Sequence, residues 1–129
     1  MTVTFGRAKM PIKLYEITLT KAVTNKFSHI KQRTGITPNL MGRVAFLKAL
    51  EANPILDELK FIDDPGQKIP KDIFFGEDEE LMALGFELYL NTHARDIDQR
   101  KLLNALVDFG AQQIPLVKSI DYLESVLGS

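Results

Sequence analysis

The residues of this chain that could do chemistry are mainly cations, and they are concentrated in its N-terminal part. Residues 1–48 contain nine basic groups and one acidic group, Glu16, which leaves a net charge of +8. The remaining residues contain seven basic and 16 acidic groups, a net charge of −9, so the overall charge of −1 conceals a bipolar molecule. Clustered lysine and arginine side chains contact nucleic-acid phosphates without reading bases. The same charge also suits an acidic protein partner or the acidic half of a second copy, so both classes of partner stay open.

Enzymatic chemistry has little support in the composition. The chain has no cysteine, which excludes disulfides, thiolate metal sites and a persulfide intermediate. Its two histidines, His29 and His93, lie far apart and lack the spacing of a metal-binding pair. No glycine-rich phosphate loop occurs, and no nucleophile is paired with a base. We therefore predict no catalytic residue, no metal site and no cofactor.

The length and the hydropathy set limits on the architecture. A chain of 129 residues is one ordinary domain, so we predict a single domain over residues 1–129, with a basic arm at 1–13. No apolar run is long enough to span a membrane, and the N-terminus lacks the apolar segment of a signal peptide. We therefore expect a cytoplasmic protein with no membrane partner.

The elements that must position the cations begin with a strand and a helix. Residues 14–19 alternate between polar and apolar side chains, which predicts a short strand. Thr20 then suits the N-cap of a helix over residues 21–33. The apolar side chains of that helix recur at helical spacing and predict its buried face, namely Val23, Phe27 and Ile30.

A tight turn and a second helix follow. Gly35 can close the first helix in the left-handed conformation, while Thr37 and Pro38 suit the cap and first position of a helix over residues 38–52. That helix is apolar almost all the way round, so it is buried either in the core or in a subunit interface. We predict an oligomer whose interface includes Met41, Phe46 and Leu50.

The remainder of the chain is predicted to be mainly helical. The patterns indicate a short helix that starts at Asn53-Pro54, a turn at 63–66, an extended segment at 67–76, and helices over 77–92, 97–113 and 116–127. The fold class is therefore mostly α. We predict a compact single-domain helical protein with a short N-terminal strand and a ribbon-helix-helix-like strand-helix-turn-helix start.

The strand-helix-turn-helix order leaves a specific alternative open. In ribbon-helix-helix regulators and antitoxins, two strands pair across a dimer and the ribbon enters the DNA major groove. Glu16 fits that reading poorly, because a carboxylate on the ribbon is repelled by the phosphates. A second alternative is a non-catalytic scaffold that joins other subunits and never touches nucleic acid.

A family resemblance is clearest over residues 33–47. This segment is similar to the signature of the DndE family, the small component of the DNA phosphorothioation (DNA sulfur modification) system. It carries Arg33-Thr-Gly-Ile-Thr-Pro-Asn-Leu, followed by Arg43 and Ala45. The resemblance continues more loosely through Phe75-Gly-Glu and Asp121-Tyr-Leu. The family often has a cysteine directly before the arginine that corresponds to Arg43, where this chain has Gly42.

The resemblance implies a helical protein that forms tetramers and binds duplex DNA, with a preference for nicked duplex, through surface lysines. It also implies association with the other subunits of the sulfur-modification complex, a system of the restriction-modification type, and no catalytic role for this subunit. Our leading hypothesis is therefore a DNA-binding accessory subunit that contacts the phosphate backbone largely without base readout. The predicted DNA-binding residues are Lys9, Lys13, Lys21, Lys26, Lys31, Arg33 and Arg43.

Overall fold

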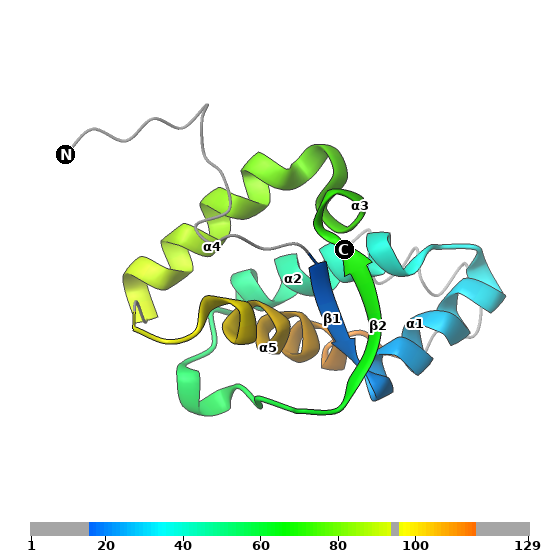
Figure 1. Ribbon diagram of the computed structural model, residues 1–129, viewed down its shortest axis with the longest axis horizontal. Helices are drawn as coiled ribbons and strands as arrows, with labels where there is room; N and C mark the ends of the chain where they lie inside the picture. The colour runs from blue at the N-terminus through cyan, green and yellow to red at the C-terminus, as the bar shows by residue number, and fades with distance from the viewer. Residues whose placement is uncertain (1–15, 94–95, 116–129) are drawn as a thin grey trace.

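A computed structural model describes residues 16–93 and 96–115, and these form one mostly helical unit with a small sheet on its surface (Figure 1). The predicted arm at 1–13 and the predicted last helix at 116–127 lie outside the described residues. In chain order the elements are β1 (Glu16–Thr20), α1 (Lys21–Thr34), α2 (Pro38–Ala52), the 3-10 helix η2 (Leu56–Glu58), β2 (Pro65–Pro70), α3 (Lys71–Phe75), the 3-10 helix η3 (Gly76–Asp78), α4 (Glu79–His93) and α5 (Gln99–Gln112).

The boundaries of α1 follow from local capping chemistry and confirm the prediction. The Thr20 hydroxyl accepts a hydrogen bond from the Val23 amide at 3.2 Å, which satisfies a donor that the first turn leaves unpaired. Gly35 adopts the left-handed conformation with φ of 80°, and its amide donates to the Lys31 carbonyl. The two ends of the helix are therefore fixed by Thr20 and Gly35, whose roles as capping residues can be predicted from the sequence.

The start of α2 also matches its prediction, with one difference. Pro38 lies at the beginning of the helix, and Thr37 occupies the N-cap position with extended backbone. The Thr37 side chain makes no capping hydrogen bond, so its contribution comes from the backbone carbonyl, which accepts from Met41 at 3.0 Å. The helix ends at Asn53, which is its left-handed C-cap with φ of 51°.

The segment between α2 and α4 differs most from the prediction. Asn53 ends α2 instead of opening a new helix, and only the single 3-10 turn of η2 follows it. Residues 67–76 are extended only as far as Pro70, after which α3 begins. Phe74 and Phe75 are fully buried on α3, and the short helix is what turns both rings into the core.

The sheet consists of β1 and β2 in antiparallel register, with Ile17 opposite Ile69 (Figure 1). Side chains cover its outer edges: the Thr18 amide donates to the Asn104 side-chain oxygen at 3.3 Å, and the Gln67 amide donates to the Thr24 hydroxyl at 2.8 Å. In a ribbon-helix-helix protein β1 would instead pair with its copy across a dimer. The intramolecular partner therefore removes the basis of that alternative.

The core is centred on the crossing of α2 with α5. Phe46 of α2 packs edge-on against Phe75 and Phe86, with ring centroids 6.0 and 6.2 Å away. Gly110 allows the two helices to approach closely, because a Cβ at this position would overlap the Ala45 carbonyl. The helix continues through Gly110 to Gln112. Position 110 therefore requires glycine because any side chain would keep the two helices apart, and not because the backbone adopts an unusual conformation.

Candidate nucleic-acid interface

The first helix concentrates positive charge in the described part of the chain. Its 14 residues include Lys21, Lys26, Lys31 and Arg33 and no acidic residue. Three side chains on the opposite face of the helix, those of Val23, Phe27 and Ile30, are buried in the core. The polar face of α1 is thereby fixed toward the outside, and it carries charge of one sign. A surface of this kind attracts phosphates or acidic side chains.

Two of these cations are exposed in the last turn of α1. Lys31 and Arg33 lie beside the helix C-terminus, where positive charge complements the partial negative charge of the helix dipole. Arg33 donates from Nε to His29 Nε2 at 2.8 Å, and this bond uses only one of the five donors of the exposed guanidinium, so the others can reach an external acceptor. The dipole alone accounts for charge of this sign here, but these two side chains remain accessible to a ligand.

Lys21, at the first turn of α1, is accessible but shares its charge with a neighbour. Its side chain is 67% exposed, and its ammonium lies 3.5 Å from the Asp64 carboxylate. An exposed ion pair of this kind contributes little free energy and exchanges readily with other partners. Lys21 can therefore contact an anion, although Asp64 competes with that anion.

Lys26 has a position different from the one expected of a DNA contact. Its ammonium donates a 2.8 Å hydrogen bond to the Ala111 carbonyl in the last turn of α5. Burial lowers the pKa of Lys26 below its ordinary value. The bond ties α1 to the end of α5, and it adds a second donor to a carbonyl that also accepts from the Ile114 amide at 3.2 Å. We therefore infer that Lys26 stabilises the fold and does not contact DNA.

Arg43 likewise serves the fold. Its side chain is only 19% exposed, and it donates from Nε to the Phe74 carbonyl and from Nη2 to the Ile73 carbonyl, the latter at 3.0 Å. Its Nη1 lies 3.9 Å from the Asp78 carboxylate. The guanidinium thus binds the carbonyl end of α3 and holds that short helix against α2. The predicted phosphate contact by Arg43 is corrected to this structural role.

Replacement of Arg43 by alanine is expected to lower the free energy of unfolding by about 2–3 kcal/mol, the cost of leaving carbonyls at a helix end without their charged donor. Urea unfolding of the purified variants measures this. Asp78→Asn is the matched control and should cost less than about 0.5 kcal/mol, because the ion pair it removes is half exposed. Equal stability of wild type and Arg43→Ala would show that Arg43 does not hold α3.

The predicted interface residues also require correction. Met41 and Phe46 are fully buried in the protomer, so they cannot face a second subunit. Leu50 is partly buried, and its side chain packs against α4 near Gly85. The apolar side chains that α2 leaves exposed are instead Leu40 and Leu47.

Neighbouring elements carry further exposed apolar side chains that the sequence analysis did not single out. Leu81 and Leu88 of α4 are 61% and 59% exposed, and Ile73 of α3 is also exposed. Leu81 and Leu88 are seven residues apart, as are Leu40 and Leu47 on α2, so each pair lies on one face of its helix. This seven-residue spacing is the feature of the sequence that could have identified these leucines as candidates for an interface. Since α2, α3 and α4 contact one another, these side chains belong to adjoining elements.

Two other classes of site find no support in the part of the chain that the structure describes. Over residues 16–93 and 96–115, no three histidine or acidic side chains converge in a way that could hold a metal ion. Within the same ranges, every helix is too short or too polar to cross a bilayer. The predicted cations Lys9 and Lys13 lie outside the described residues.

Comparison with known proteins places this geometry in a family. The family model described as DNA sulphur modification protein DndE matches residues 16–117, most of the chain. The chain belongs to the DndE family. The crystal structure of DndE from Escherichia coli B7A, described as involved in DNA phosphorothioation modification, superposes with a TM-score of 0.62 at 22% identity. The match covers 78% of this chain and 96% of that one. No curated protein sequence matches significantly.

Membership in the DndE family connects this protein to DNA sulfur modification, and the structure explains the architecture of the segment that resembles the DndE signature. Gly35 and Pro38 form the turn between α1 and α2, and Arg43 holds α3. At Gly42, where a cysteine is common in the DndE family, a Cβ would overlap the ring of Phe74. Phe74 therefore occupies the space that a side chain at position 42 would need.

Proposed function

We propose that this chain is the DNA-contacting accessory subunit of a DNA phosphorothioate-modification complex, and that it performs no chemistry itself. The exposed cations Lys21, Lys31 and Arg33 of α1 contact the phosphate backbone largely without base readout. Lys9 and Lys13 of the N-terminal arm extend this contact. The observation that carries the proposal is the charge of α1, four basic residues and no acidic one over 14 residues. Contact with DNA implies a cytoplasmic location.

Lys26 and Arg43 do not take part in the proposed contact. Their charged groups are already bound to the Ala111, Ile73 and Phe74 carbonyls, and release of either would break a bond that ties two helices together. Lys31 and Arg33 are exposed and do not hold one helix against another. Phosphate oxygens can therefore replace the water molecules that are hydrogen-bonded to the nitrogens of these two side chains. The interface is therefore smaller than the sequence alone predicts.

The proposal includes a homo-oligomer, which the family resemblance suggests is a tetramer. Leu40, Leu47, Ile73, Leu81 and Leu88 are the exposed apolar side chains of α2, α3 and α4 that such an oligomer would bury. Exposed apolar side chains on adjoining elements are typical of a protein–protein interface. Assembly would place several copies of α1 on one particle and raise the number of phosphates that one particle contacts.

Replacement of Leu81 and Leu88 together by glutamate is expected to convert the oligomer to a folded monomer, because an oligomer would have to bury two unpaired carboxylates. Sedimentation velocity should show the mass falling to that of one chain, 14.6 kDa. Glu87→Gln is the control on the same helix and should keep the wild-type mass. A wild-type protein that is already monomeric at micromolar concentration would contradict this part of the proposal.

A direct binding assay separates the proposal from its alternatives. Fluorescence anisotropy with intact duplex, nicked duplex and unrelated sequences at physiological salt should show binding to all of them, with the nicked duplex preferred. A preference of about 1000-fold for one palindromic sequence would instead indicate a sequence-specific regulator. Failure to bind any of these duplexes would favour a scaffold that contacts only the other subunits of the complex.

A further inference from the structure

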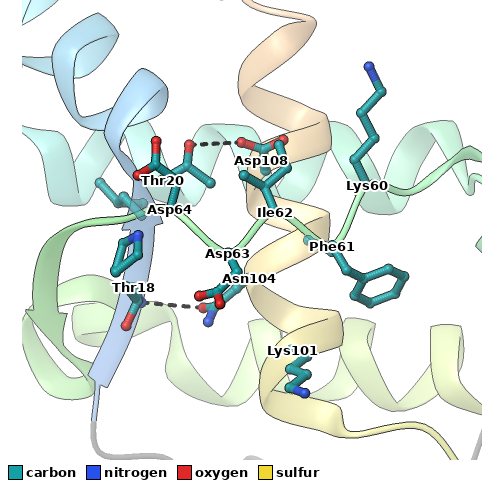
Figure 2. Close-up of a pocket in the computed structure, with 13 residues that line it drawn as sticks. Thr18, Thr20, Lys60, Phe61, Ile62, Asp63, Asp64, Lys101, Asn104 and Asp108 are labelled. Carbon is teal, nitrogen blue, oxygen red and sulfur yellow. Dashed lines mark hydrogen bonds between the residues drawn. The ribbon is translucent and has the colours of Figure 1, made fainter.

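A pocket of about 370 Å³ lies away from the exposed leucines, between the C-terminal half of β1, the segment 60–65 and α5 (Figure 2). Its walls combine apolar surface from Leu19, Pro65 and Ala105 with polar groups from all three elements. The volume is within the range of pockets that bind small molecules or single large side chains. Neither the proposed DNA contact nor the exposed leucines account for it.

Three of the polar groups that line this pocket are carboxylates, which only accept hydrogen bonds when ionised. Asp108 of α5 is 95% buried, as its exposed fraction is 5%, and it accepts a hydrogen bond from the Thr20 hydroxyl at 3.0 Å. Asp63 and Asp64 contribute two more carboxylates from the segment over the pocket, and Asp64 lies beside Thr20 (Figure 2). An interior of this kind favours a ligand that carries donors and positive charge.

Asp64 is paired with Lys21 at 3.5 Å in an exposed ion pair that exchanges readily with other partners, whereas the two lysines that line the pocket do not neutralise Asp63 or Asp108 directly. Figure 2 shows the Lys60 ammonium directed away from the carboxylates and Lys101 near the opposite end of the pocket from Asp108. No ion pair joins either lysine to Asp63, Asp64 or Asp108 in the described residues. Lys60 acts on Asp108 only through space, and its charge lowers the pKa of that carboxyl, while burial, the larger effect, raises it.

The shape of the acceptor set identifies the class of cation. Because the three carboxylates do not converge on one point, the described residues form no metal site here. A planar guanidinium has five donors spread over its edge and two apolar faces, so it can reach separated acceptors while it packs on the walls. An ammonium group concentrates its donors at one point and fits this arrangement less well.

The rim of the pocket indicates that the guanidinium comes from a protein. Phe61 and Ile62 are each 47% exposed on the segment that covers the pocket, and the ring of Phe61 points outward in Figure 2. Exposed apolar side chains around a pocket with charged acceptors resemble the surroundings of an arginine anchor in a protein–protein interface. We propose that this pocket binds an arginine side chain presented by a partner protein.

The test uses the full-length chain labelled with ¹⁵N and titrated with N-acetyl-arginine amide. Saturable amide shifts are expected at Thr18, Thr20, Asp63, Asn104 and Asp108, with an affinity on the order of millimolar for so small a ligand. N-acetyl-citrulline amide has the same shape without the charge and should cause no shifts there. Equal shifts with citrulline, tighter binding of spermidine, or shifts confined to other residues would overturn the assignment.

Variants of the pocket sharpen this test. Asp108→Asn keeps an acceptor for Thr20 but removes the charge, so the affinity for the arginine probe should fall at least about tenfold. Lys60→Gln should bind the probe more tightly, because it removes a like charge near the site. Glu80→Gln on α4 removes one exposed carboxylate elsewhere and should bind like wild type. An unchanged affinity in Asp108→Asn would refute the proposal.

The folding of Asp108→Asn can be checked independently of binding. Burial raises the pKa of the Asp108 carboxyl, so the folded state takes up this proton at a higher pH than the unfolded chain does. The stability that this residue contributes is therefore full below the ordinary aspartate pKa and is lost as the pH rises through the higher folded value. Relative to wild type, Asp108→Asn should be more stable at pH 7 than at acidic pH. If it is unfolded, Asp63→Asn, on an exposed residue, serves as the second variant.

The inference is separate from the proposed DNA contact. Asp108 is on α5, and its removal leaves the exposed cations of α1 in place. Duplex binding by Asp108→Asn should therefore equal that of wild type, whereas its affinity for the arginine probe should fall at least about tenfold. Conversely, a chain that fails to bind DNA can still bind the probe, so the two proposals fail independently.

Discussion

Replacement of Gly110 by alanine is expected to destabilise the protein by about 3 kcal/mol, the upper end of the cost of overpacking. The added Cβ would overlap the Ala45 carbonyl and lie 2.9 Å from Ala45 Cα. These atoms belong to the backbone of α2, so no side-chain rotation can relieve the contact. The two helices would have to separate at the centre of the core, where both Leu106 of α5 and Phe46 of α2 are fully buried.

Thermal and urea unfolding of Gly110→Ala measure this effect, and Gly85→Ala is the matched control. A Cβ at Gly85 would meet only the end of the Leu50 side chain, which can rotate away. Alanine also favours a helix over glycine by about 1 kcal/mol, so Gly85→Ala should be near neutral. A Gly110→Ala variant as stable as Gly85→Ala would mean that α2 and α5 do not approach as closely as the structure shows.

Replacement of both Lys31 and Arg33 by glutamine is expected to weaken duplex binding by about 100-fold at physiological salt. Each lost hydrogen bond to a charged phosphate costs about 1.5 kcal/mol at the lower end of the usual range. Two such losses total about 3 kcal/mol, and 1.4 kcal/mol corresponds to tenfold. The folding stability of the variant should change little, because both side chains are exposed.

Arg100→Gln with Lys101→Gln is the control for this pair. Both residues are exposed in the first turn of α5, and this turn is at the end of the helix that lies away from α1 (Figure 1). The double variant removes the same charge. It should bind duplex with an affinity within a few-fold of wild type. If both double variants lose affinity equally, overall charge governs binding and α1 is not the contact surface.

Much of the fold is predictable from the sequence, because capping residues act locally. Thr20, Gly35 and Pro38 fix the ends of α1 and the start of α2 through bonds and backbone angles that depend on a few adjacent residues. The buried face of α1 is equally legible, since its three buried side chains recur at helical spacing. The mostly helical class with a short N-terminal strand is confirmed.

The predictions that the structure contradicts concern features that depend on contacts between residues far apart in the sequence. β2 has few strand-forming side chains and exists because β1, which precedes α1 and α2 in the chain, supplies its partner. Arg43 and Lys26 read as surface cations, yet their acceptors are carbonyls of α3 and α5. Met41 and Phe46 read as interface residues because the sequence cannot show that α5 and α3 cover α2. The sequence therefore could not show that Lys26 and Arg43 are held within the fold, and the DNA contact by the exposed cations of α1 stays a prediction.

The salt dependence of duplex binding tests the proposed phosphate contact most directly. The logarithm of the binding constant should fall linearly with the logarithm of salt concentration, by about 0.9 for each phosphate contacted. For each protomer engaged with DNA, Lys31→Gln with Arg33→Gln should reduce the magnitude of this slope by about 1.8, whereas Arg100→Gln with Lys101→Gln should leave it unchanged. A flat salt response of the wild type, or an unchanged slope in the α1 variant, would contradict the account.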